Sequence, residues 1–90
     1  MEFEWNEEKA EVNLAKHGVS FEEAKTSFAD PFYIDFYDPD HSEGEERYIL
    51  IGQSAQLRLL VVSYTERGTK TRLISAREAT RQEKETYEEH

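Results

Sequence analysis

The stretch that decides the fold of this 90-residue chain is residues 47–74, RYILIGQSAQLRLLVVSYTERGTKTRLI. It contains three segments rich in β-branched and aromatic residues, which favour strands: 47–53, 57–66 and 70–74. Three residues separate each segment from the next, a length typical of hairpins between antiparallel neighbours. The middles of the first two segments are continuously apolar, which predicts central strands covered on both faces.

The residues before this stretch predict two helices and a further strand. Asn6 can cap a first helix, and Ser20 opens a capping box at the start of a second. Asp30-Pro31 stops the second helix, and residues 32–37 then alternate in the pattern of a strand. Residues 38–45 are rich in Asp, Pro, Ser and Gly, which is typical of a loop.

The two ends of the chain complete the predicted fold. Residues 1–5 alternate apolar and acidic side chains, as a short strand would. Ser75 and Glu78 have the spacing of a capping box, which predicts a C-terminal helix from Ser75 towards Tyr87. We therefore expect one α+β domain over residues 1–90, with two N-terminal helices, an antiparallel sheet of about four strands and a C-terminal helix. Residues 1–5 could add a short strand to that sheet.

Charge is distributed unevenly in a chain whose formal net charge is -9. Residues 1–45 hold 3 Lys/Arg and 13 Asp/Glu, a balance of 3 − 13 = -10, whereas residues 46–90 hold 8 and 7, a balance of +1. This acidity argues against a protein that coats nucleic acid generally, but it is compatible with a basic partner or a local anion site. The chain has no cysteine and no apolar run long enough to span a bilayer, so we expect a cytoplasmic protein.

A cluster of cations interrupts this acidity between residues 67 and 77. Four cations and no acid fall in this interval: Arg67, Lys70, Arg72 and Arg77. Because the guanidinium fork matches phosphate oxygens, we expect the cluster to bind phosphate. Arg77 would lie in the first turn of the predicted last helix, whose free N–H groups also favour an anion. The alternative is that these side chains pair with surface acids, as single arginines usually do.

The order and spacing of several short strings resemble the BrnT toxins, the ribonuclease halves of a bacterial type II toxin–antitoxin system. The strings are FEW (3–5), KHGVSFEEA (16–24), DP (30–31), HS (41–42), EER (45–47), IG (51–52), LLVV (59–62), YTERG (64–68) and RLISAR (72–77). The resemblance implies a RelE-like fold and RNA cleavage without a metal or other cofactor. It also implies a co-expressed DNA-binding antitoxin, BrnA, through which the toxin would act on DNA only indirectly. The acids of the predicted last helix depart from the more basic helix of many RNA-binding relatives.

Cleavage of this kind needs a base for the 2′-hydroxyl, a cation for the phosphorane and an acid for the leaving oxygen. We expect four side chains to act in catalysis: His17, Glu46, Arg67 and Arg77. Four more are expected to bind the substrate: Arg47, Tyr64, Lys70 and Arg72. The general base stays open among four groups: His17, Glu46, Glu66 and Lys70.

Several of these residues have a plainer interpretation. His17 could simply close its helix, and a strand tyrosine such as Tyr64 more often packs in the core. His41 and its neighbouring acids could hold a metal, but a solvated acidic loop is the stronger interpretation and we expect no metal site.

Two other classes of function compete with the ribonuclease. One is a catalytically silent binding module that forms a repressor complex with its DNA-binding partner. The other is a structural protein without a catalytic role. The free protein could be a monomer or homodimer, and a complex with the antitoxin could be a heterotetramer. The RNA target and any need for the ribosome stay open.

Overall fold

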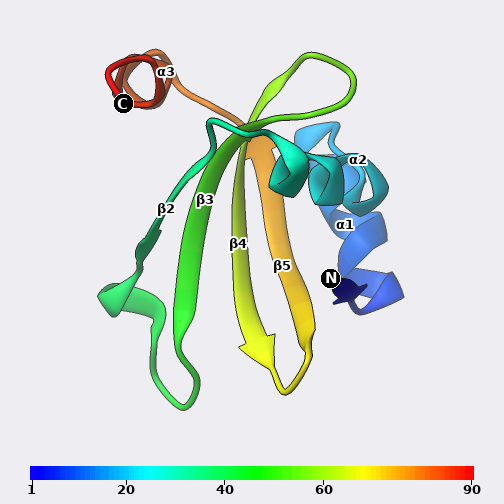
Figure 1. The fold of residues 1–90 in the computed structure, drawn as a ribbon. Coiled ribbons are helices and arrows are strands. Elements are labelled where there is room, and N and C mark those ends of the chain that lie inside the picture. Colours follow the sequence, from blue (N-terminus) through cyan, green and yellow to red (C-terminus); the bar gives the residue numbers. More distant parts are fainter.

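A five-stranded mixed sheet forms the centre of the computed structural model, which describes all 90 residues (Figure 1). The strands are β1 (Glu2–Glu4), β2 (Ile34–Tyr37), β3 (Arg47–Gln53), β4 (Leu59–Arg67) and β5 (Lys70–Glu78). The helices are α1 (Glu7–His17), α2 (Phe21–Thr26) and α3 (Arg81–Glu88), with short 3₁₀ turns η1 (Ser27–Ala29) and η2 (Pro39–His41). No helix is long and apolar enough to cross a membrane.

The strand order β1-β5-β4-β3-β2 confirms most of the predicted sheet. Strands β2 to β5 form antiparallel pairs in sequence order, as expected of a meander. β1 joins as the fifth strand and pairs in parallel with β5, with Phe3 opposite Thr71. The sheet is therefore mixed, with one parallel pair, β1 and β5, and three antiparallel pairs.

The boundary between β5 and the last helix was predicted wrongly. Residues 75–78 do not cap a helix but continue β5, where Ala76 is opposite Val62 and fully buried. The capping box that opens α3 is formed by Thr80 and Glu83 instead. Pairing with β4 and burial of Ala76 outweigh a local capping signal that is worth about 1 kcal/mol.

The remaining differences are small shifts of strand ends. β2 begins at Ile34 rather than at residue 32, and β4 begins at Leu59 rather than Leu57. Leu57 has a positive φ of 67°, a conformation that ends strand pairing and makes the β3–β4 connection five residues long, 54–58.

The hydrophobic core lies between the sheet and the two N-terminal helices, which cover the same face. Its nine buried residues are Val19, Phe21, Ala24, Leu50, Leu60, Val62, Tyr64, Leu73 and Ala76. The opposite side, hereafter the open face, is not covered by α1 or α2. The prediction of two covered faces is met only in part there, because Ile51 and Val61 are buried and α3 contacts β3. Side chains alternate between the two sides along each strand. The open face therefore carries Arg47, Ile49 and Ile51 of β3, Val61, Ser63, Thr65 and Arg67 of β4, and Lys70, Arg72, Ser75 and Arg77 of β5.

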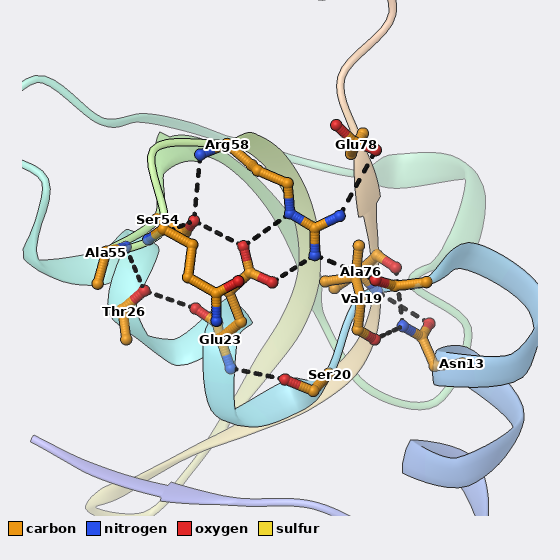
Figure 2. Close-up of polar contacts among 12 residues, drawn as sticks. Asn13, Val19, Ser20, Glu23, Thr26, Ser54, Ala55, Arg58, Ala76 and Glu78 are labelled. Carbon is orange, nitrogen blue, oxygen red and sulfur yellow. Dashed lines mark hydrogen bonds and ion pairs between the residues drawn. The ribbon is translucent and has the colours of Figure 1, made fainter.

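Two buried polar contacts hold the helices against the sheet (Figure 2). The Asn13 amide donates to the carbonyl oxygens of Ala76 and Val19, and its oxygen accepts the Ala76 N–H. These bonds fix α1 along β5. In the second contact, the Glu23 carboxylate accepts from Ser54 and Arg58, which ties α2 to the β3–β4 connection.

Candidate functional site

The open face gathers the cations that the sequence singled out. Arg47 is opposite Thr65, Thr65 is opposite Arg72, and Arg67 is opposite Lys70, so these cations project from the same side. Simple alternation would place Arg72 and Arg77, five residues apart, on opposite sides. A β-bulge prevents this, because Ser63 pairs with Ser75 and Tyr64 pairs with Leu73, which leaves Ile74 as the extra residue. The bulge brings Arg77 to the open face.

A cavity of about 450 Å³ lies on this face. Its lining residues come from the β2–β3 connection and the three central strands: Asp38, His41, Arg47, Ile49, Val61, Ser63, Ile74, Ser75 and Arg77. An apolar floor of Ile49, Val61 and Ile74 thus carries two arginines, a histidine and two hydroxyl groups at its walls. To an anion between the arginines, the walls offer hydrogen-bond donors from the guanidinium and hydroxyl groups, and one acid–base group, His41. The one acid in the lining, Asp38, is hydrogen-bonded to His41.

Arg47 is the one arginine of six with no carboxylate at ion-pair distance. The other five each have an acidic partner: Arg58, Arg67, Arg72, Arg77 and Arg81. The Nε atom of Arg47 is also buried without any hydrogen-bond partner. A buried donor of this kind is costly unless an acceptor is supplied, and an anion in the cavity would supply one.

Arg77 is held in place by α3. Its Nη1 and Nη2 donate to the two oxygens of Glu83 at 2.7 and 2.8 Å, and Nη1 also donates to the Glu78 carbonyl at 3.2 Å. The hydrogen bonds that Arg77 donates to Glu83 raise the pKa of Arg77 and lower the pKa of Glu83 to about 2. This pairing leaves the Nε–Nη2 edge of the guanidinium as a second fork for an anion.

His41 enters the cavity from η2, where its Nδ1 lies 2.9 Å from Asp38 Oδ2. The Ser42 hydroxyl donates to the Asp38 carbonyl and accepts the Arg47 N–H, so the histidine loop is tied to the start of β3. Sequence reasoning considered His41 only as a metal ligand. The Asp-x-x-His spacing on a helical turn is the signal that could have identified the pair. No group of three or more His, Cys, Asp or Glu side chains is arranged to hold a metal.

Three predicted cations flank the cavity rather than line it. Arg67 reaches Glu45 at 3.1 Å, and Arg72 lies 3.7 Å from Glu4. Lys70 is exposed at the β4–β5 turn, beside Arg67. These three side chains contribute positive potential to the open face without contacting the space between Arg47 and Arg77.

Three predicted residues point to the helix side instead. Tyr64 is only 6% exposed, stacks on Tyr48 and donates its hydroxyl to Asp35. Burial raises the pKa of Tyr64, and the side chain has no free face for stacking on a base. Glu46 accepts from the Tyr48 hydroxyl and Glu66 accepts from the Thr71 hydroxyl. The register therefore separates both carboxylates from Arg47.

His17, expected in catalysis, lies at the end of α1 and not in the cavity with Arg47. It lines a second hollow of about 440 Å³ between α1 and β5. Ile74 and Ser75 are shared walls of both spaces. The structure thus brings together Arg47, Arg77 and His41, and places His17 in the adjoining hollow.

Known proteins match this chain both in sequence and in fold. A family model described as the ribonuclease toxin BrnT of a type II toxin–antitoxin system matches residues 5–83. The chain is similar to the crystal structure of the Brucella abortus ribonuclease toxin BrnT, with 25% identity over 90% of this chain and 99% of that one and a TM-score of 0.66. No curated protein matches the sequence. Since the family model spans most of the 90 residues, this chain belongs to the BrnT family of type II toxin–antitoxin ribonuclease toxins.

Proposed function

We propose that this chain is an endoribonuclease toxin of RelE-like fold that cleaves RNA without a metal, using the cavity of the open face. The observation that carries the proposal is the unpartnered guanidinium of Arg47 beside Arg77 and His41. Membership of a family of ribonuclease toxins supports the reaction class. The geometry supports the location, since a phosphate between the two arginines would receive a fork from each.

The reaction uses the 2′-hydroxyl of RNA as its own nucleophile. A base takes the hydroxyl proton, O2′ bonds to phosphorus, and the bond from phosphorus to O5′ breaks with protonation of O5′. The products are a 2′,3′-cyclic phosphate and a free 5′-hydroxyl. We assign both proton transfers to His41, which takes the proton of O2′ and returns it to O5′ as the P–O5′ bond breaks, while Asp38 orients the ring through Nδ1. Arg47 and Arg77 stabilise the negative charge that develops on the phosphoryl oxygens.

The test is cleavage of single-stranded RNA by purified Arg47→Ala and His41→Ala variants. Loss of one such donor lowers kcat by about 10²–10³-fold in enzymes that stabilise an oxyanion, and we expect a loss of this size for Arg47→Ala. Arg81→Ala is the matched control, because Arg81 is 94% exposed on α3 and outside the cavity. If Arg47→Ala cuts RNA within about twofold of wild type, the cavity is not the active site.

A type II toxin–antitoxin system pairs its toxin with an antitoxin, and we propose that the partner of this chain is a DNA-binding antitoxin of the BrnA kind. We propose that it neutralises the toxin by covering the open face, where a carboxylate from the antitoxin could take the phosphate position beside Arg47. Such a contact would explain how one partner blocks both the cations and the histidine.

One observation favours the alternative of a silent co-repressor. Three of the four cations between residues 67 and 77 already have carboxylate partners, Glu45, Glu4 and Glu83. If wild-type protein binds its antitoxin but neither cleaves nor binds RNA, this alternative replaces the ribonuclease.

A further inference from the structure

The second hollow adjoins the proposed active site along the edge of β5. β1 pairs with β5 only as far as Arg72, so the rest of this edge has no strand beside it. α1 lies there instead, anchored by the bonds of Asn13 to Ala76. Because Ile74 and Ser75 border both spaces, a ligand in the cavity can continue over these two residues towards α1.

The chemistry of this hollow suits an anionic chain. Lys9 and Lys16 line it, and neither has a carboxylate at ion-pair distance, although the chain carries a net charge of -9. They are seven residues apart in α1, which places them on one side of the helix and about 10 Å apart. His17 lies next to Lys16 in the same lining and Glu8 is the one acid there.

We propose that the hollow is a subsite for the nucleotides flanking the scissile phosphate of single-stranded RNA. Lys9 and Lys16 each bind one phosphate of the flanking segment, and His17 contacts the nucleotide between the cavity and the lysines. This inference rests on the proposed function, and it gives His17 a binding role in place of the catalytic role expected from the sequence. The substrate would lie across the strands, from η2 over β3, β4 and β5 to α1.

Binding of a non-cleavable ligand tests the subsite. A fully 2′-O-methylated oligonucleotide lacks the nucleophile, so wild-type protein can be titrated without cleavage over a range of salt concentrations. Each phosphate contact to a single strand contributes about 0.7 to the slope of log K against log salt. We expect the double variant Lys9→Ala/Lys16→Ala to reduce this slope by about 1.4 and to weaken binding several-fold.

The matched control is Lys25→Ala/Lys84→Ala, which removes the same charge outside both spaces. A 2′-O-methylated dinucleotide, which spans only the cavity, should not distinguish the two double variants. In cleavage assays His17→Ala should raise KM for long RNA more than it lowers kcat.

Each other outcome has a definite meaning. Equal slopes for wild type and Lys9→Ala/Lys16→Ala would overturn the subsite while leaving the active-site proposal intact. Equal losses in both double variants would assign the effect to overall charge, and would also overturn it. Wild type that neither binds nor cleaves RNA would overturn the proposed function and the subsite together.

Discussion

The arginines of the open face differ in whether a carboxylate already pairs with them. Arg47 has no acidic partner, whereas Arg77 is held by Glu83 through both terminal nitrogens. Arg77 can still bind an anion although it is paired with Glu83, because on the Nε–Nη2 edge of its guanidinium Nε and the second N–H of Nη2 donate to neither Glu83 oxygen. We therefore propose that Glu83 is a positioning residue, since one carboxylate both caps α3 and pairs with Arg77.

Glu83→Gln tests this positioning. The amide keeps one acceptor but loses the charge-assisted pair, so we expect kcat/KM to fall about tenfold, the equivalent of about 1.4 kcal/mol. Thr80→Ala is the control, since it removes the other half of the capping box and leaves the contacts of Arg77 in place. Comparable losses of kcat/KM in both variants would attribute the effect to α3 stability rather than to Arg77.

The same carboxylate makes stability depend on pH. The pKa of Glu83 is about 2 in the folded chain and 4.5 when unperturbed, so folding stabilises its charged form. Its contribution is fully present above pH 4.5 and is lost as the pH falls towards 2. We expect Glu83→Gln to flatten the decline of the free energy of unfolding in that window, as measured by urea denaturation. An unchanged decline would show that Glu83 is not coupled to folding.

At the scale of elements, the helices are attached to the sheet by a few buried polar contacts. Glu23 of α2 accepts from Arg58 and Ser54 at the β3–β4 connection, and the bond from Arg58 lowers the pKa of Glu23. α3 is attached at the same end of the sheet, where the Tyr87 hydroxyl donates to Asp30, whose carboxylate also accepts the Gln53 N–H. Burial first, and this carboxylate second, raise the pKa of Tyr87 to about 12.

Replacing Glu23 tests the attachment of α2. In Glu23→Gln the Arg58 guanidinium loses the buried negative charge that it faces and keeps only an amide acceptor, which we expect to cost about 3 kcal/mol. For a chain of this size that corresponds to a fall in Tm of more than about 10 °C. Glu22→Gln is the control, because Glu22 makes only a surface pair with Lys25. Equal melting temperatures for the two variants would mean that the buried pair contributes no net stability.

Over the whole molecule, charge is divided between the two halves of the sequence. The acids of residues 1–45 dominate the net charge, yet the central strands present a cationic open face. The overall acidity limits non-specific binding of nucleic acid, and the local cations retain attraction for a single strand that reaches the cavity. This division is what the proposed cleavage of RNA by an acidic chain requires.

Growth of cells that express the chain from a tightly regulated promoter tests the function of the whole molecule. We expect wild type and Arg81→Ala to arrest growth and degrade RNA, whereas Arg47→Ala and Arg77→Ala should do neither, because each lacks one phosphate fork. Growth rate and total RNA integrity are the measurements. A harmless wild type with intact RNA would favour the co-repressor.

Local sequence by itself determined much of this protein. The caps at Asn6 and Ser20 place two helices correctly, and β-branched runs locate β3 and β4, because these signals act over a few residues. The cations between residues 67 and 77, which the sequence predicts to bind phosphate, lie together on the open face. Family resemblance was also evident from the sequence, since it depends on the order of motifs.

The composition of the site was decided only by tertiary structure. Pairing with β4 turned residues 75–78 from an expected helix start into strand, and a bulge at Ile74 set the side on which Arg77 emerges. Strand register likewise turned Tyr64 and Glu46 towards the helices, and the β2–β3 connection carried His41 to Arg47. The physical reason is that the side of the sheet on which a residue lies, and the residues that it contacts, depend on long-range strand pairing, which local propensity does not encode.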